Sequence, residues 1–421
     1  MQQAIAIIDL GKTRGKLSLW TLDGGLIHQA DRVNDRSVVG GVAQLDVAGI
    51  SAWLTAALAD AARRADIVAI VPVGHGAAAV LTDGEAVVAA LDYEAAIPAE
   101  VASAYDAERD PFEATLSPRL EGGLNLGAQL FRLERLYPDL WPKRGEALLW
   151  PQYWVFALSG VRASEVTSLG CHSDLWRPLE RRFSDLAERR GWAGRLGPIR
   201  GAGEALGPVR PSIAAATGLT PGCLVYCGLH DSNAALHAAR GCAELCSGTF
   251  SVVSTGTWFV CLSTGGAGPE RYDPAEDMLA NVDVAGRPTP TARFMGGRDY
   301  EAWMGEALGA KSDMALIGEA AALADWRTAA GPLRATRAAV ELARRTDRAL
   351  KLVAAEGPIL IEGRFAGDEV FGASLATLRP AQAVWRSSLG DGVALGALRL
   401  ALPDLRLPPL TPVAPASVLA V

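Results

Sequence analysis

The sequence predicts an α/β protein made of two halves that each begin with strands. Strand-like and helical runs alternate through the first half, and a second strand-rich segment at 249–263 opens another half. Helical patterns then dominate from 299 to about 345, before a strand returns at 358–362. The chain has 421 residues, 50% of them hydrophobic, which is enough for two domains of roughly 100 to 200 residues each. We place their junction near Gly241.

The first half begins with a strand meander. Strands are expected at 4–9, 16–21 and 26–30, and the glycine-containing turns between them are expected at 11–15 and 23–25. Residues 47–65 carry apolar side chains at helical spacing and end in two arginines, which suit the carboxyl end of a helix. A strand at 66–73 follows. Further helices are predicted at 127–137, which stops before Pro138, and at 179–190, a charge-dense segment.

Charge and composition exclude several classes of protein. The 40 basic and 47 acidic residues give a formal charge of -7, which is the wrong sign for binding nucleic acid or anionic membranes. The longest apolar region, 67–81, is interrupted and too short for a membrane helix. The six cysteines lie mostly among apolar neighbours, and the amino terminus lacks the features of a secretion signal. We therefore expect a cytoplasmic protein without nucleic-acid or membrane partners.

The turn after the first strand carries groups that suit a polyphosphate. Gly11-Lys12-Thr13 ends like a P-loop, but the glycine that such a loop needs further upstream is replaced by Ala6, inside the strand. What remains is Asp9 at the strand end, two glycines, a threonine hydroxyl and three cations, Lys12, Arg14 and Lys16. Turn amides form a concavity for anions, and the cations offset their charge. An ordinary basic hairpin explains the same residues, so this motif alone leaves both readings open.

Asp231 lies where a predicted strand, 224–227, meets a predicted helix, 234–240. A carboxylate at such a junction either takes part in catalysis or simply caps the helix. Beyond that helix, Ser254-Thr255-Gly256-Thr257-Trp258 interrupts a strand with a hydroxylated turn that can present amides and hydroxyls to phosphate. This second turn favours the catalytic reading.

Four fragments in this order resemble the FGGY carbohydrate kinases. They are Asp-Leu-Gly at 9–11, Gly-Leu-His-Asp-Ser-Asn-Ala at 228–234, Ser-Thr-Gly-Thr-Trp at 254–258, and Gly363-Arg364 followed by Gly-Asp-Gly-Val-Ala-Leu-Gly-Ala at 390–397. Gly-His-Gly-Ala at 74–77 is similar to the family's sugar-contacting segment. The tryptophan after the Gly-Thr pair and the histidine before Asp231 resemble the rhamnulokinase and fuculokinase branches most.

This resemblance implies two actin-like (ribonuclease H-like) domains of the superfamily that contains sugar kinases, actin and heat-shock chaperones, with a cleft between the domains. Residues 1–241 would form the domain that binds sugar and carries the catalytic base, and residues 242–421 would form the nucleotide-binding domain. The resemblance also implies ATP and Mg²⁺ as cofactors and a small-molecule sugar as substrate. A homodimer stays open.

The resemblance assigns roles to individual residues. Asp231 would be the general base, since the sugar hydroxyl must lose a proton as it attacks the γ-phosphorus. Asp9 would hold Mg²⁺ through water, which suits an ion that gives up its water reluctantly. The sugar contacts would be His75, Gly76, His230 and Asp231. The nucleotide contacts would be Lys12, Thr13, Arg14, Lys16, Gly256, Thr257, Gly363 and Arg364.

Three positions depart from the family pattern and bear on substrate and ATP preference. Lys12 and Arg14 replace small hydroxylated residues, and Gln129 replaces a lysine. The leading function is ATP-dependent phosphorylation of a ketose or deoxyketose such as L-rhamnulose or L-fuculose. One alternative is a catalytically weak nucleotide- or sugar-sensing protein of the same fold, and another is a cytoskeletal or chaperone-like ATPase.

Overall fold

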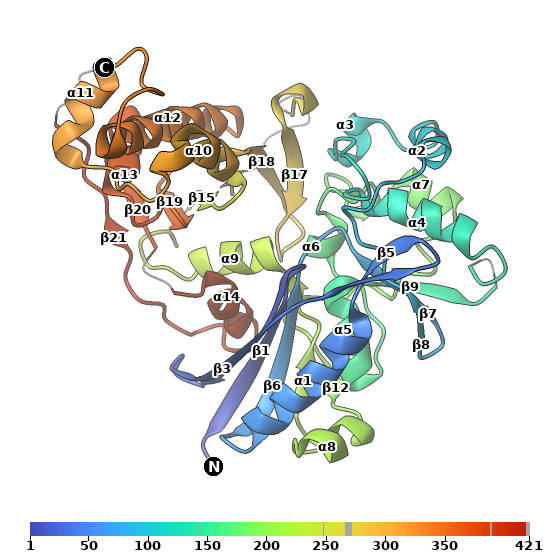
Figure 1. Ribbon diagram of the computed structural model, residues 1–421. Coiled ribbons are helices and arrows are strands. Elements are labelled where there is room, and N and C mark those ends of the chain that lie inside the picture. The colour runs from blue at the N-terminus through green and yellow to red at the C-terminus, as the bar shows by residue number, and fades with distance from the viewer. Residues whose placement is uncertain (142, 247, 266–271, 388–389, 418–421) are drawn as a thin grey trace. The chain divides into compact units, whose positions relative to one another are not determined.

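The chain forms two compact units in the computed structural model, which describes residues 1–141, 143–246, 248–265, 272–387 and 390–417. Unit 1 contains residues 1–241, 280–288 and 391–407, and unit 2 contains residues 242–279, 289–390 and 408–421. The chain therefore enters unit 2 after Gly241 and returns twice to unit 1. Both units combine sheets with helices, which confirms the α/β prediction (Figure 1).

Unit 1 is built on a seven-stranded sheet in the order β12-β13-β6-β1-β2-β3, with β14 also paired to β6. Its strands are β1 (Gln3–Leu10), β2 (Arg14–Thr21), β3 (Leu26–Val33), β6 (Asp66–Gly74), β12 (Ala205–Pro208), β13 (Leu224–Tyr226) and β14 (Leu229–His230). The predicted meander is β1 to β3, which pair antiparallel in sequence order. Strands β1 and β14 both run parallel to β6, so their carboxyl ends lie at one edge of the sheet.

Helices cover this sheet because its central strands are apolar on both faces. Ala4, Ala6, Ile8 and Leu10 of β1 share one core cluster with residues of α1 (Val47–Ala62). Successive side chains of a strand point to opposite faces, so Asp9 faces the other side. Helix α14 (Gly392–Ala401) contacts β1 and β6 and lies beside α9 (Asp231–Ala239) (Figure 1).

The remainder of unit 1 consists of small sheets and short helices. The small sheets pair β4 (Arg36–Val39) with β5 (Val42–Leu45), β7 (Ala79–Asp83) with β8 (Ala86–Ala89) and β9 (Gly145–Leu149), and β10 (Trp176–Arg177) with β11 (Arg182–Phe183). The helices are α2 (Ala99–Asp106), α3 (Phe112–Thr115), α4 (Leu126–Leu136), α5 (Trp150–Ser159), α6 (Val166–Leu169), α7 (Asp185–Arg189) and α8 (Pro211–Thr217).

The prediction of a helix at 179–190 was wrong over most of this range. Only Asp185–Arg189 is helical, and the residues before it form the β10–β11 hairpin, in which Trp176 pairs with Phe183. Two contacts explain the difference, and the second comes from a distant part of the chain. The rings of that pair meet edge to face at 5.6 Å, and the Asp110 carboxylate accepts hydrogen bonds from the first backbone amides of α7. A local charge pattern does not reveal either contact.

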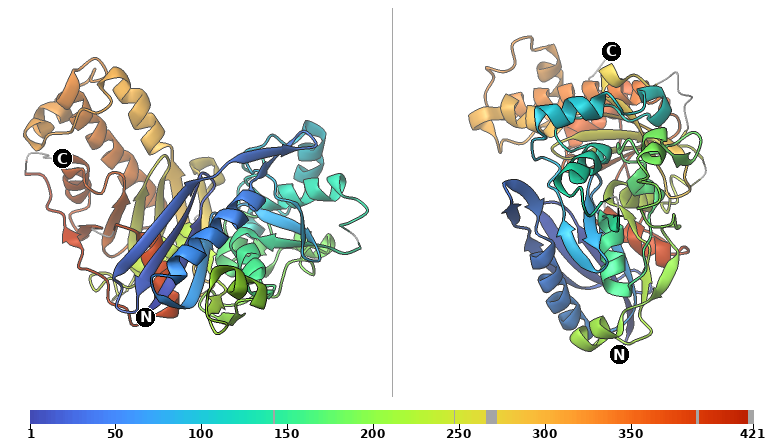
Figure 2. Two further views of the ribbon diagram at one scale, coloured as in Figure 1. Left: turned by 60° about the horizontal axis from the view of Figure 1, so that its bottom comes forward. Right: turned by 90° about the vertical axis from the view of Figure 1, so that its right-hand side faces the viewer.

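Unit 2 is centred on a second seven-stranded sheet, in the order β17-β18-β16-β15-β19-β20-β21. Its strands are β15 (Ser251–Thr255), β16 (Phe259–Ser263), β17 (Met278–Val282), β18 (Pro288–Phe294), β19 (Ile359–Gly363), β20 (Val384–Arg386) and β21 (Thr411–Pro412). The last three residues of β17 and the first residue of β18 belong to the segment 280–288 that is assigned to unit 1. Its helices, drawn mainly in orange in Figure 2, are α10 (Gly296–Met304), α11 (Ile317–Ala322), α12 (Gly331–Leu352) and α13 (Glu369–Leu378). The long α12 contacts the other three helices and β16, and so organises this core.

None of the helices in the described ranges combines the length and apolar character needed to span a bilayer.

Candidate active site

The carboxyl ends of β1, β6 and β14 bring the predicted catalytic and sugar-contacting residues of unit 1 to one edge of its sheet. Asp9 lies opposite Val73 of β6, and Leu229 of β14 lies opposite the same residue on the other side. His75 directly follows β6, whereas His230 ends β14 and Asp231 begins α9. The edge where parallel strands end is where open α/β sheets bind their ligands.

Asp231 reaches this edge because Gly228 allows a close approach to β6. Gly228 has a positive φ of 70°, and a Cβ there would overlap the carbonyl of Pro72. One carboxylate oxygen of Asp231, Oδ1, accepts hydrogen bonds from the amide of Ser232 and lies 3.2 Å from Nε2 of His230. The second oxygen, Oδ2, has no hydrogen-bond partner within the described ranges. That oxygen is available to a ligand.

His75 offers a neutral acceptor beside this carboxylate. Its Nδ1 donates to the carbonyl of Gly76 at 2.8 Å, and its ring stacks on Trp150 with 5.4 Å between centroids. Burial lowers the pKa of His75, so the imidazole is neutral at neutral pH. The Nε2 atom is buried and has no hydrogen-bond partner in the part of the chain that the structure describes. A ligand hydroxyl would satisfy it.

Three carboxylates and one lysine form the charged part of the site. Lys16 Nζ lies 2.5 Å from Asp391 and 3.5 Å from Asp9. Burial raises the pKa of Asp9 to about 6; Lys16 lowers it, while Asp231 and Asp391 raise it further. Negative charge thus exceeds positive charge, which fits a divalent cation. No group of three or more His, Cys, Asp or Glu side chains within the described ranges could hold a metal by itself, so Mg²⁺ here would need water or phosphate oxygens.

Lys12 lies in a different environment from the one expected of a phosphate-binding group. Its ammonium is 2.7 Å from Asp92 and 2.5 Å from Glu94, and its side chain is only 6% exposed. It also lies 4.4 Å from the centre of the Tyr93 ring, whose edge meets His75. Two carboxylates already balance its charge. This position favours a role on the sugar side of the site.

The rest of the first loop fits its predicted role better. Thr13 and Arg14 are exposed, and neither side chain has a partner among the described residues. Asn34 holds the turn by donating to the carbonyls of Gly11 and Thr13. A rigid turn with a free hydroxyl and a free guanidinium is suited to phosphate.

In unit 2, the two predicted nucleotide segments end neighbouring parallel strands. Thr255 of β15 lies opposite Gly363 of β19, so Gly256 and Thr257 follow one strand, while Arg364 follows the other. The hydroxyl of Thr255 donates to the carbonyl of Glu362 and accepts from the amide of Phe365, which fixes the two loops together. The side chain of Thr257 is exposed.

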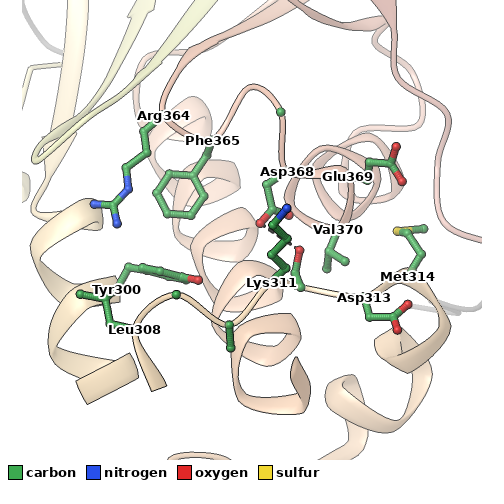
Figure 3. Close-up of a pocket in the computed structure, with 14 residues that line it drawn as sticks. Tyr300, Leu308, Lys311, Asp313, Met314, Arg364, Phe365, Asp368, Glu369 and Val370 are labelled. Carbon is green, nitrogen blue, oxygen red and sulfur yellow. Dashed lines mark hydrogen bonds between the residues drawn. The ribbon is translucent and has the colours of Figure 1, made fainter. Parts of the chain in front are cut away.

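A pocket of about 720 Å³ opens beside Arg364 in unit 2. Figure 3 shows Arg364, Phe365 and Tyr300 in one part of it and Lys311 and Asp368 in another. The rings of Tyr300 and Phe365 meet edge to face at 5.0 Å, and the guanidinium of Arg364 pairs with Glu301 at 2.6 Å. This volume is typical of small-molecule sites, and the aromatic rings suit a nucleoside.

Several residues of the site were missed by sequence reasoning. Asp92 and Tyr93 lie a few residues beyond the end of β8, and an acidic residue shortly after a strand is the signal that could have found them. Asp391 was seen only as part of a motif, yet it caps α14 and holds Lys16. Gln129, noted for replacing a lysine, donates to the carbonyls of Ala77 and Gly123 and is buried. It therefore supports the segment behind His75.

Comparison with known proteins connects these arrangements to kinases. A family model described as the C-terminal domain of FGGY carbohydrate kinases matches residues 247–332 and 318–408. A carbohydrate kinase from Novosphingobium aromaticivorans is 40% identical, with a TM-score of 0.91 over 99% of this chain and 95% of that one. A comparison with curated proteins finds no match.

More distant solved structures share the fold. A xylulose kinase from Rhodospirillum rubrum is 18% identical, with a TM-score of 0.78 over 98% of this chain and 94% of that one. A Plasmodium falciparum glycerol kinase with ADP is 12% identical, with a TM-score of 0.74 over 96% and 90%. The predicted likeness to rhamnulokinases and fuculokinases is not confirmed, because the similar structures whose names give a substrate include xylulose, glycerol and gluconate kinases.

Proposed function

The chain belongs to the FGGY family of carbohydrate kinases, and from this premise we propose that Asp231 is the general base of an ATP-dependent sugar phosphorylation in unit 1. The observation that carries this proposal is the arrangement of Asp231, His75 and Asp9 at one sheet edge. Oδ2 of Asp231 and Nε2 of His75 both lack partners within the described part of the chain. Two unsatisfied acceptors suit two hydroxyls of one polyol.

In the proposed reaction, one sugar hydroxyl donates its proton to Oδ2 of Asp231 as its oxygen attacks the γ-phosphorus of ATP. His75 would accept a hydrogen bond from a second hydroxyl and so fix the orientation of the sugar. Lys12 and Tyr93 would limit the space beside it. Phosphoryl transfer needs mainly positioning and charge neutralisation, and these residues supply the positioning.

Mg²⁺ fits beside Asp9, because this carboxylate has an excess of negative charge around it. When bound, the ion would neutralise charge on the phosphates during transfer. Lys16 would hold Asp9 in place, since it already joins Asp9 to Asp391. Thr13 and Arg14 would contact phosphate oxygens. In unit 2, the pocket beside Arg364 would take the adenosine, and Thr257 would contact phosphate.

The proposed substrate is a ketose or deoxyketose, such as L-rhamnulose, L-fuculose or a related sugar. This choice rests on the histidine before Asp231 and the tryptophan after Thr257. A panel of ketoses, aldoses and polyols, followed by coupled ADP release, tests it. A ketose should give the highest kcat/KM, whereas turnover confined to aldoses or polyols would contradict the substrate class. A catalytically weak sensor would bind a sugar without measurable ADP formation.

Replacing Lys12 with methionine should raise the KM for sugar about 10-fold, while the KM for ATP changes less than about 2-fold. Removing the ammonium leaves the exposed Arg36 as the remaining cationic partner of the two carboxylates beside Tyr93 and His75, and a hydrogen bond to a charged group contributes about 1.5 to 3 kcal/mol. Arg36→Met is the matched control, because Arg36 contacts the same carboxylates from an exposed position and should matter little. A larger rise in the KM for ATP than in the KM for sugar would indicate that Lys12 contacts the phosphates instead.

Replacing Thr257 with valine should raise the KM for ATP about 10-fold and leave the KM for sugar within about 2-fold, because only the nucleotide would lose a hydrogen bond. Thr257→Ser keeps the hydroxyl and should behave like the wild type. Steady-state kinetics with each substrate varied in turn measures both constants. Equal KM values for ATP in the valine and serine variants would show that the hydroxyl does not face phosphate.

A further inference from the structure

Behind Asp231 lies a buried cysteine in contact with His230. Sγ of Cys171 is 3.5 Å from Nε2 of His230, and the same nitrogen is 3.2 Å from Oδ1 of Asp231. Cys171 is 3% exposed and His230 is 6% exposed. Gly76 lies against both, because a Cβ there would come within 2.6 Å of the sulfur and 3.0 Å of the imidazole. A side chain at position 76 would therefore clash with both Cys171 and His230.

The backbone around Cys171 directs its sulfur toward the imidazole. Cys171 lies just beyond α6, and the next residue, His172, has a positive φ of 37°. Non-glycine residues in this region carry strain that the surrounding structure must hold. Nδ1 of His172 is held by the carbonyl of Leu124 at 2.7 Å. Across the site, Thr167 of α6 accepts a hydrogen bond from the backbone amide of His230 at 3.0 Å.

We propose that Cys171 is a positioning residue for Asp231. Its thiol gives its proton to His230, and the resulting thiolate and imidazolium form a buried pair that holds the imidazole against the Asp231 carboxylate. The S–H bond breaks, its electron pair stays on sulfur, and a new N–H bond forms at Nε2 of His230. This inference rests on the proposed role of Asp231 as the base.

The charges around the pair favour this proton position. Burial alone would raise the pKa of Cys171, but His172 and His230 outweigh it and lower that pKa. Burial alone would lower the pKa of His230, but Cys171, Asp231 and Glu165 outweigh it and raise that pKa. The remaining facing group, His75, is neutral because burial lowers its pKa. The surrounding charges therefore favour the proton on His230 over the proton on sulfur.

A second buried group, the side-chain amide of Asn233, can accept a hydrogen bond from the imidazolium of His230. Nδ1 of His230 lies 3.3 Å from the side-chain amide nitrogen of Asn233, whose Oδ1 is buried without a hydrogen-bond partner among the described residues. An amide turned about its axis exchanges its oxygen and nitrogen. In that orientation Oδ1 accepts the Nδ1–H of the imidazolium, which satisfies both groups.

The thiolate matters because a lone imidazolium would weaken the base. Without the thiolate, Asp231 and Glu165 would be the anions that keep His230 protonated, and the imidazolium would then hold the Asp231 carboxylate in an ion pair that makes it a weaker acceptor of the sugar proton. The thiolate balances the imidazolium, so the pair orients Asp231 without adding net positive charge. A serine at position 171 keeps a hydroxyl in this place, but it does not ionise at accessible pH.

The test combines two measurements that do not depend on each other. The ultraviolet absorbance of thiolates, recorded on the wild-type protein without substrate, should show one thiolate at neutral pH. Cys171→Ser should remove that signal, whereas Cys246→Ser, which changes an exposed cysteine, should keep it. Without a thiolate signal in the wild type, the proposed pair is wrong, whether or not any variant folds.

The second measurement is the pH profile of kcat. Cys171→Ser should lower kcat about 10-fold near pH 7, less than the 100-fold or more that removal of a general base costs, with the KM for sugar within about 3-fold. Its kcat should recover as pH rises, because His230 then loses its proton and releases Asp231. A profile parallel to the wild type would overturn the positioning role. The base assignment itself fails separately, if Asp231→Asn remains active while the thiolate signal persists.

Discussion

Replacing Asp231 with asparagine should lower kcat by at least about 100-fold while sugar binding stays measurable. Asparagine keeps an oxygen that can accept from the amide of Ser232, so the start of α9 should survive, but it does not take a proton from the sugar hydroxyl. Coupled ADP release measures the rate, and calorimetry with the best substrate of the panel measures binding.

The control for this variant is Asp185→Asn. Asp185 also adds a negative charge to the first turn of a helix, α7, but its side chain is half-exposed, pairs with Arg177 and Arg182, and takes no part in the site. It should leave kcat unchanged. If Asp231→Asn turned over within a few-fold of the wild type, Asp231 would not be the base and its carboxylate would only stabilise the first turn of α9.

Replacing Asp9 with asparagine should lower kcat/KM for ATP by about 100-fold, which corresponds to about 2.7 kcal/mol of lost transition-state stabilisation. The variant loses the negative charge that is proposed to bind Mg²⁺, so it should also need more Mg²⁺ for half-maximal rate. Lys16 keeps Asp391 as a partner, and β1 keeps its pairing with β2 and β6. Titration of Mg²⁺ at saturating ATP measures the requirement.

The matched control is Asp31→Asn, which removes an exposed carboxylate from β3 in the same sheet. Its Mg²⁺ dependence should equal that of the wild type. An Asp9→Asn protein with unchanged Mg²⁺ dependence would show that the ion is held elsewhere, even if its rate were reduced.

Sequence reasoning found the elements that local patterns determine. The meander, the strand before His75 and the junction at Asp231 follow from apolar runs punctuated by glycine, and the structure contains all of them. The α/β class follows from their alternation. In the same way, the resemblance of four short motifs was enough to place the chain among FGGY carbohydrate kinases.

Features that depend on distant partners were not accessible from local patterns. Asp92 and Glu94, about 80 residues further along the chain, form the surroundings of Lys12. The local sequence shows only that Lys12 is a cation, and this charge alone suggested a phosphate contact. The contact between Cys171 and His230 spans 59 residues, and the residues next to Cys171 in the sequence give no sign of it. Likewise, residues 391–407 return to unit 1, where Asp391 meets Lys16.

The most direct test of the account is a crystal structure of the protein with its best sugar, Mg²⁺ and a nonhydrolysable ATP analogue. We expect one sugar hydroxyl within about 2.6 to 3.2 Å of Oδ2 of Asp231, the distance at which a general base can take a proton. A second hydroxyl should donate to Nε2 of His75. A sugar bound away from Asp231, or with neither hydroxyl in these positions, would contradict the assignment of this site.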